Sequence, residues 1–292
     1  MKNLSNYILE AKKQNLDIDR KQPKSRFELE MLISSAFKRK QYDLNFIDTS
    51  KITDMSKLFK SVKHNFDVSS WDVSNVTNMM WMFSGCYNFT GKGLENWNVS
   101  NVKDISYMFT YCEKFNCDLS TWDVSNVKNM RHTFDFCKNF IGKGLENWNV
   151  SNVTDMTCMF LHCKKFNCDL SNWDMSNVID TSLMFSDCTK FTGKGLENWD
   201  VSKVKNMYTM FGDCTNFNCD LSNWDVDNVE TMKNMFNGCK KFTGKGLENW
   251  NVSKVKNMRT MFSGCKFDYH ELDWDLSGLS SQLKTFRNYL GD

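Results

Sequence analysis

The residues of this chain that could do chemistry are twelve cysteines, four histidines and a recurrent Gly-Lys-Gly. Cysteine with histidine or carboxylate can bind a metal or form a nucleophilic pair, and glycine with lysine can bind a phosphate. The histidines lie at different repeat positions, and none has a cysteine or carboxylate at metal-ligand or triad spacing. Gly-Lys-Gly lacks the longer frame that binds phosphates, so it indicates a turn. We expect no catalytic residue, no metal site and no cofactor. The histidines are His64, His132, His162 and His270.

The placement of the cysteines predicts a structural role. Eight cysteines follow a recurrent tryptophan by 15 residues, and three others recur every 51 residues. Free cysteine behaves as a small apolar side chain, so a column at one repeat position is typical of a core. We expect reduced thiols, in agreement with an N-terminus that lacks a hydrophobic signal core. The two columns are Cys86, Cys112, Cys137, Cys163, Cys188, Cys214, Cys239 and Cys265, and Cys117, Cys168 and Cys219.

The tryptophan itself recurs at alternating steps of 26 and 25 residues. A fixed period of this length predicts a solenoid, in which each unit buries its apolar face only against its neighbours. The step alternates because one kind of unit enters through Gly-Lys-Gly-Leu-Glu-Asn-Trp (142–148) and the next through Phe-Asn-Cys-Asp-Leu-Ser-x-Trp (115–122). The tryptophans are Trp71, Trp97, Trp122, Trp148, Trp173, Trp199, Trp224 and Trp250.

Each unit shows two local patterns. Residues 67–73 alternate around the tryptophan, which predicts a short strand. Val76 to Cys86 carries apolar residues at steps of 3, 3, 1 and 3, which predicts an amphipathic helix. The expected fold is therefore an α/β repeat solenoid of about ten strand-turn-helix units of 25–26 residues.

Residues 1–45 are expected to form an α-helical N-terminal cap, and residues 46–292 the solenoid, with degenerate first and last repeats. One helical segment carries Leu4, Tyr7, Ile8 and Ala11. Another opens with the capping box Ser25-Arg-Phe-Glu28 and ends at the basic residues 38–40. In the last repeat, Phe286 is expected in a core column.

The formal net charge of +2 provides no global field that would attract nucleic acid, and we expect no such partner. The chain contains no apolar run near the length of a membrane span, so no transmembrane segment is expected. The oligomeric state and the identity of the ligand stay open.

The string Trp-Asp-Val-Ser-Asn-Val-x-Asn-Met-x-x-Met-Phe-x-x-Cys, as in residues 71–86, resembles the repeat of the BspA-type leucine-rich-repeat surface proteins. The likeness covers roughly residues 42–290. It implies a leucine-rich-repeat-like, right-handed solenoid and a role in adhesion or protein recognition at a microbial surface. The family carries no catalytic residues.

The candidate binding residues lie at two positions, 10 and 14 residues after the tryptophan, which vary freely while core positions barely vary. Four apart on a helix, they are expected to share one face and to form a stripe along the array. Aromatic residues in such a stripe are typical of an interface. The alternatives are that the N-terminal cap or a return loop covers them, or that they lie partly in the core. The candidates are Trp81, Tyr107, Tyr111, His132, Phe136 and His162.

The Ser and Asn columns after the tryptophan, such as Ser74 and Asn75, are a second possible ligand surface. We favour a structural role, because short polar side chains satisfy backbone groups in turns.

The leading functional hypothesis is a non-enzymatic scaffold that binds a protein, or alternatively a glycan, through the solenoid surface. The alternatives are a structural or antigenic rod without a specific ligand, and an intracellular effector. The lack of a signal peptide favours the cytoplasm, whereas the family resemblance favours the cell surface or secretion.

Overall fold

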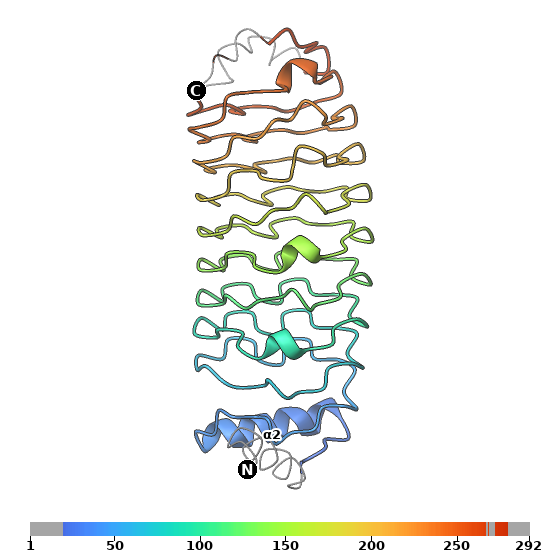
Figure 1. The fold of residues 1–292 in the computed structure, drawn as a ribbon, viewed down its shortest axis with the longest axis vertical. Helices are drawn as coiled ribbons and strands as arrows, with labels where there is room; N and C mark the ends of the chain where they lie inside the picture. Colours follow the sequence, from blue (N-terminus) through green and yellow to red (C-terminus); the bar gives the residue numbers. More distant parts are fainter. Residues whose placement is uncertain (1–19, 267, 269–271, 280–292) are drawn as a thin grey trace, which may run out of the picture.

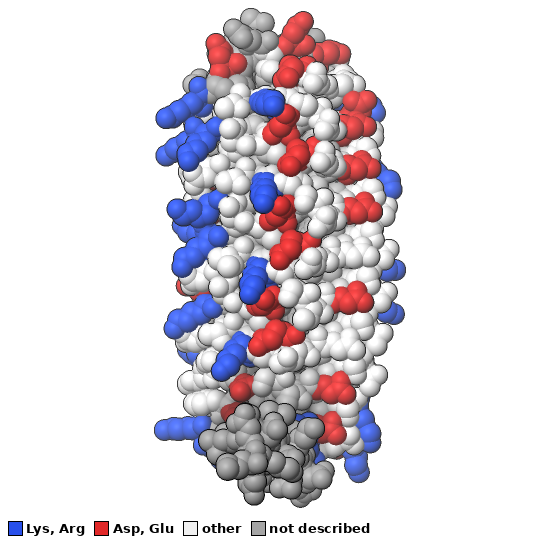
Figure 2. Space-filling model, viewed as in Figure 1, with Lys and Arg blue, Asp and Glu red and all other residues white. Residues whose placement is uncertain are grey.

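The computed structural model describes residues 20–266, 268 and 272–279. These residues form an elongated stack of similar coils, each lying on the one before it (Figure 1). The stacked coils form a rod, and charged side chains lie in lengthwise columns on its surface (Figure 2). The first expected helical segment, at Leu4–Ala11, and the expected core residue Phe286 lie outside the described residues.

The second expected helical segment is confirmed as helix α2, Arg26–Lys38. Its N-cap Ser25 accepts a hydrogen bond from the backbone N–H of Glu28, and the Glu28 carboxylate accepts one from the N–H of Lys24. Its buried residues are Leu29, Ile33 and Ala36. The ring of Phe37 lies 6.4 Å from that of Phe59 in the first coil, so α2 covers the beginning of the core.

Consecutive coils are joined by hydrogen bonds from alternate backbone N–H groups. In one coil the N–H groups of Met79, Trp81, Phe83 and Gly85 donate to carbonyl oxygens of the next coil at 3.0, 3.0, 2.9 and 2.7 Å. The same four bonds recur along the stack. One parallel bridge per coil runs through Asp54, Asn78, Asp104, Asn129, Asp155, Asp180, Asn206, Thr231 and Asn257.

The other N–H groups of this segment close tight turns within the coil. Met82 donates to the carbonyl of Met79, and Cys86 to that of Phe83, each to the third residue before it. The third residue of each turn, Trp81 or Gly85, has a positive φ of 62° or 76°. This combination is typical of type II turns. Two such turns in succession therefore occupy each coil.

The predicted α/β architecture of strand-turn-helix units is wrong. The stretch Val76–Cys86 forms these turns, and residues 67–73 form only an isolated bridge at Asp67. The only other helices among the described residues are the short 3₁₀ helices η1 (Leu94–Asn96), η2 (Leu145–Asn147) and η3 (Leu247–Asn249). The apolar steps of 3, 3, 1 and 3 fit paired turns as well as a helix, because both bring every third or fourth residue to one side.

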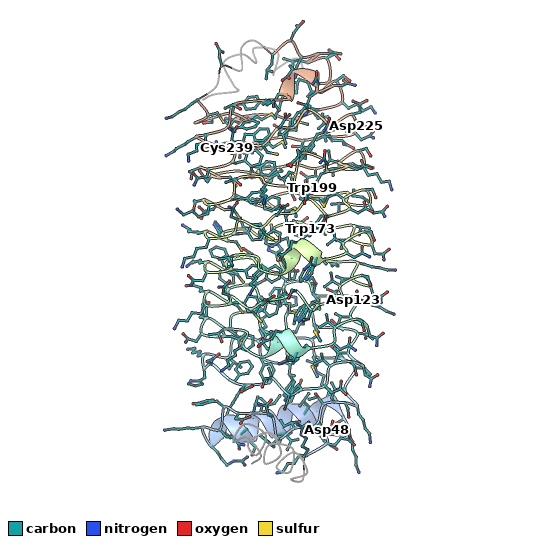
Figure 3. The ribbon with its side chains drawn as sticks, in the orientation of Figure 1. Asp48, Asp123, Trp173, Trp199, Asp225 and Cys239 are labelled. Carbon is teal, nitrogen blue, oxygen red and sulfur yellow. The ribbon has the colours of Figure 1, made fainter. Side chains whose placement is uncertain are left out.

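The core is made of columns that run along the rod. Phe83, Phe109 and Phe134 are fully buried, and their rings stack in sequence with centroids 5.5 and 5.6 Å apart. The recurrent tryptophan forms a second column near the middle of the rod, where Figure 3 labels Trp173 and Trp199. These two indoles lie parallel at 6.2 Å.

Each indole also has a polar contact. Trp122 donates its Nε1–H to the carbonyl of Leu94 at 2.8 Å, and Trp148 donates to Leu119 at 3.2 Å. A buried indole N–H without a partner would be costly. The tryptophan period is therefore fixed by both ring packing and a hydrogen bond to the preceding coil.

The cysteines belong to the core, as the sequence predicts. All twelve are free thiols, and in the eight-member column each Sγ lies about 3 Å from a phenylalanine carbonyl of the preceding coil, for example Cys163 from Phe134 at 3.0 Å. Burial is the first cause that raises the pKa of these thiols, to about 12 for Cys86 and Cys117. They fill space and are poor nucleophiles.

Gly-Lys-Gly is confirmed as a turn. Its second glycine precedes each 3₁₀ helix with a positive φ, 94° at Gly144. A Cβ on Gly144 would lie 2.1 Å from the backbone nitrogen of Ser120 in the preceding coil. Glycine is thus required there both for its conformation and for the close approach of two backbones.

Gly144→Ala should destabilise the protein by on the order of 3 kcal/mol or more, because left-handed strain adds to a backbone collision. Gly264→Ala is the matched control. It has a φ of +75°, but its Cβ would meet its nearest neighbours at an ordinary 3.5 Å. It should cost only about 1–2 kcal/mol. Urea unfolding followed by circular dichroism measures both, and equal midpoints would contradict the collision argument.

In the native protein the thiols with pKa about 12, for example Cys86 and Cys158, should react with a disulfide reagent at pH 8 roughly a thousandfold more slowly than free cysteine. The reason is that their thiolate fraction is smaller by about three powers of ten. In denaturant all twelve thiols should react. Rapid labelling of several native thiols would show that this core is open.

Candidate functional site

The aromatic strip consists of the six candidate residues predicted from the sequence, and the structure brings them together in two adjacent columns. Position 10 contributes Trp81, Tyr107 and His132, and position 14 contributes Tyr111, Phe136 and His162. Their common helix face was a wrong expectation. They occupy the third position of the two successive turns of each coil, and each column runs from coil to coil.

Within each column the rings stack directly. Trp81 and Tyr107 lie 4.1 Å apart at an interplanar angle of 5°, and Tyr107 and His132 lie 4.5 Å apart at 10°. In the other column Tyr111 and Phe136 stack at 4.4 Å, and Phe136 meets His162 at 4.1 Å. The His162 ring is tilted by 46° from that of Phe136, whereas the faces of the other five rings cover one another.

All six residues have a positive φ, between 54° for His132 and 62° for Trp81 and Tyr111. This conformation costs an L-residue roughly 1–2 kcal/mol, and each stacked pair returns about 0.5–1.5 kcal/mol. The sequence held a signal that we did not use. The same columns contain Gly85, Asn234 and Gly238, the residue types that tolerate positive φ.

The strip lies at the surface. Tyr111 is 40% exposed, and Trp81, Tyr107 and Phe136 are partly exposed. Sequence analysis missed Tyr87, which is 49% exposed and has its ring 6.4 Å from that of Tyr111. Tyr87 follows the cysteine column by one residue, at a position that is polar in the other coils. An aromatic residue at this otherwise polar position could have identified it from the sequence.

Polar contacts fix the ends of the two columns. His132 Nδ1 lies 2.8 Å from Asp135 Oδ2, and His162 Nδ1 lies 2.9 Å from Asp187 Oδ2. Sequence spacing alone did not identify these two carboxylate contacts. Both contacts orient a stacked ring, because one nitrogen of each imidazole is engaged by the carboxylate.

Basic side chains complete the strip. The Lys60 ammonium lies over the Trp81 ring, 4.4 Å from its centroid, and Arg131 Nε donates to the Tyr107 hydroxyl at 3.1 Å. A cation over an indole face is an attractive contact. Lys60 thus covers the one face of Trp81 that Tyr107 leaves open.

The Ser and Asn columns have the structural role that we favoured. Asp72 accepts a hydrogen bond from the N–H of Ser74 at 2.9 Å, and Asn75 Nδ2 donates to the carbonyl of Ser50 at 2.8 Å. Equivalent contacts recur from coil to coil. The Asn75 amide is thus occupied by a backbone carbonyl, and the Ser74 hydroxyl by the Asp72 carboxylate that accepts the turn N–H.

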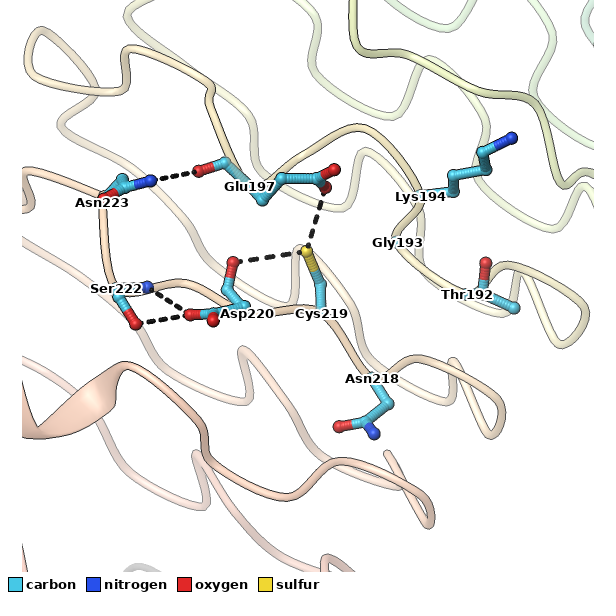
Figure 4. Close-up of a pocket in the computed structure, with 9 residues that line it drawn as sticks. All are labelled: Thr192, Gly193, Lys194, Glu197, Asn218, Cys219, Asp220, Ser222 and Asn223. Carbon is cyan, nitrogen blue, oxygen red and sulfur yellow. Dashed lines mark hydrogen bonds between the residues drawn. The ribbon is translucent and has the colours of Figure 1, made fainter.

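Polar grooves of about 610 Å³ lie where the two kinds of coil meet. Figure 4 shows one of them, between Lys194 and Asp220, with the Cys219 thiol 3.8 Å from the Glu197 carboxylate. Its counterpart lies between Lys92 and Asp118. The groove recurs because the 51-residue pair of coils recurs along the chain.

Cross-coil ion pairs hold the charged groups of this face. Lys143 Nζ lies 2.8 Å from Asp118 Oδ2, and Lys245 Nζ lies 2.6 Å from Asp220 Oδ2. Hydrogen bonds from these lysines, followed by those from Ser120 and Ser222, lower the pKa of both aspartates to about 2. These lysines and aspartates are already paired with one another and therefore have little remaining capacity to bind a ligand.

Among the described residues, no group of three or more His, Cys, Asp or Glu side chains has an arrangement that could hold a metal ion. The helices found in the same part of the chain are too short or too polar to span a bilayer. Of the remaining histidines, His64 lies 4.9 Å from the ring of Tyr42, and His270 is outside the described residues.

Comparison with known proteins gives one family. The model described as "Mycoplasma protein of unknown function, DUF285" matches residues 28–143, 117–195 and 184–290. No curated protein matches the chain. A solved structure described as "Crystal structure of TLR13-ssRNA13 complex" is 12% identical, with a TM-score of 0.26. The match spans 77% of this chain and 38% of that chain. At that TM-score it carries no argument. The narrower BspA-type resemblance is not confirmed, and the chain belongs to the DUF285 family.

Proposed function

We propose that this protein is a non-enzymatic recognition scaffold that binds a protein partner through the aromatic strip. The observation that carries the proposal is the strip itself: six rings packed in two columns at the surface, five of them stacked and His162 tilted against Phe136, at two positions that vary freely between repeats. Contiguous aromatic side chains at a surface are typical of protein interfaces.

The orientation of the rings favours a protein over a glycan. Sugars bind aromatic residues by lying against an open ring face. Here Tyr107 is stacked on both faces, between Trp81 and His132, and Lys60 covers the outer face of Trp81. The column of Trp81, Tyr107 and His132 therefore presents mainly ring edges, together with the Tyr107 hydroxyl. Such edges suit the mixed apolar and polar contacts of a protein surface.

The strip is also pre-organised. Stacking, the His132–Asp135 contact and the fixed turns restrain the side chains before any partner arrives. A side chain that is already ordered loses less conformational entropy on binding, and this loss otherwise costs about 0.5–1.5 kcal/mol per residue. The strip can thus contribute aromatic anchors at low cost.

The resemblance of the repeat to BspA-type surface proteins supports adhesion as the biological setting of this binding. The paired charges and occupied turn residues elsewhere support a binding role over an enzymatic one. The proposal is thus of a rigid rod whose variable columns recognise the partner.

Replacing Tyr107→Asn together with Phe136→Gly should lower affinity for the partner about 30-fold or more, because aromatic hot spots contribute 2 kcal/mol or more. Asn and Gly are the residues that the array itself uses at these positions, in Asn234 and Gly238, so the turns should persist. Quantitative affinity capture with immobilised wild-type and variant protein, read by mass spectrometry, measures the loss.

The matched control makes the same substitutions in the polar half of the two columns, Thr209→Asn with Asp213→Gly. Both residues also have a positive φ, 53° and 58°. Circular dichroism should show equal folding for both variants. If the strip variant retains every protein that wild type and control retain, the strip is not the binding surface.

A further inference from the structure

Unpaired lysines gather along one edge of the rod. They lie one or two residues after the cysteine column, and Figure 2 shows the basic edge that they form along the left side of the molecule. Within the described part of the chain none of the following makes an ion pair, and all are exposed: Lys63, Lys114, Lys165, Lys190, Lys240 and Lys241.

Unpaired aspartates gather along the opposite edge. They directly follow the recurrent tryptophan, or Ile47 in the first coil, and Figure 3 labels Asp48, Asp123 and Asp225 on the side of the rod away from Cys239. The red column nearest the right side of Figure 2 is this acidic edge, and some basic side chains project beside it. No described lysine or arginine forms an ion pair with its exposed members Asp72, Asp123, Asp174, Asp200 and Asp225.

The separation of charge is strong but not complete. On the basic edge Glu113 is paired with Lys138 at 2.8 Å and Asp187 with Lys164 at 3.3 Å, and the exposed Asp213 directly precedes Cys214. Near the acidic edge, Lys203 and Lys254 donate to the amide oxygens of Asn177 and Asn228. Hydrogen bonds from Ser125 lower the pKa of Asp123.

The two edges have the same spacing, because both columns belong to one stack of coils. Stacked backbones of this kind repeat at about 4.8 Å, so charges on either edge recur at that step or its multiples. A second copy laid alongside, in the same direction, presents its acidic column to the basic column of the first at an identical period. An unrelated anionic surface has no reason to match it.

We propose that this protein self-associates side by side and in parallel, with the lysine edge of one copy against the aspartate edge of the next. The contact is heterologous, so it leaves an unused edge at each end and permits open rows. The inference goes beyond recognition by the aromatic strip, and neither depends on the other.

The expected association is weak and sensitive to salt. An exposed ion pair contributes about 0–1 kcal/mol, so only the repetition over several coils can produce a measurable contact. Sedimentation velocity of the full chain should show reversible oligomers at about 0.02 M salt that dissociate at about 0.5 M, where screening acts over about 4 Å. A single monomer peak at low salt and high protein concentration would overturn the proposal.

An edge variant tests the residues. Asp123→Asn, Asp174→Asn and Asp225→Asn should weaken association at least about tenfold, because three of the pairs disappear. Asparagine already occupies this column at Asn98 and Asn149, where its side chain caps the same turn. The fold should therefore be unchanged.

The control carries Asp104→Asn, Asp155→Asn and Asp180→Asn, which alter net charge equally. These aspartates lie in the column of parallel bridges, where Asn78 and Asn129 accept the same hydrogen bond from the backbone. Control protein should associate as wild type does. Equal weakening in both variants would mean that net charge alone controls association, and would refute the edge contact.

A mixing experiment gives the sharpest result. A lysine-edge variant should be monomeric alone, as should the aspartate-edge variant, yet their mixture should form dimers and stop there. Dimers arise because each variant keeps one intact edge. If instead the lysine-edge variant only loses binding to vesicles containing phosphatidylserine, and self-association never occurs, the edge is a membrane contact. The lysine-edge substitutions are Lys114→Gln, Lys165→Gln, Lys190→Gln and Lys241→Gln.

Discussion

The hydrogen bonds from alternate backbone N–H groups of one coil to the carbonyls of the next are the constraint on which the rest of the structure depends. They require every coil to return to the same place after 25 or 26 residues, so the tryptophan, phenylalanine and cysteine columns must coincide. They also leave the intervening N–H groups to close turns within the coil. Those turns require positive φ at two positions, and these positions become the aromatic strip.

Much of this arrangement was predictable from residue spacing. The tryptophan step, the buried cysteines, the turn at Gly-Lys-Gly and the helix that Ser25 caps are all set by local patterns. The paired turns within each unit could not be distinguished from a helix by apolar spacing, because Met79, Met82, Phe83 and Cys86 face inward in either conformation. Hydrogen bonding between coils decides between them, and that bonding joins residues about 25 apart.

The candidate site shows the same division. Its columns follow from variation between repeats, so Tyr107 and Phe136 could be identified without a structure. Their conformation and ring stacking could not, because they depend on the neighbouring coil. Tyr87 escaped notice because it lies outside both columns. Residues that satisfy the backbone thus recur with the period, whereas those that face outward are free to differ.

The two kinds of coil have a consequence for how such a chain changes length over generations. Gly142 of one coil lies against the next, where a Cβ would come within 2.6 Å of Phe166 and 2.7 Å of Cys168. A gene that gained or lost a single coil would place two coils of one kind together and misalign this contact. Gain or loss of a whole duplication preserves it. Recombination between the similar 51-residue segments would therefore lengthen or shorten the rod in pairs of coils, and would exchange the exposed columns without disturbing the interior.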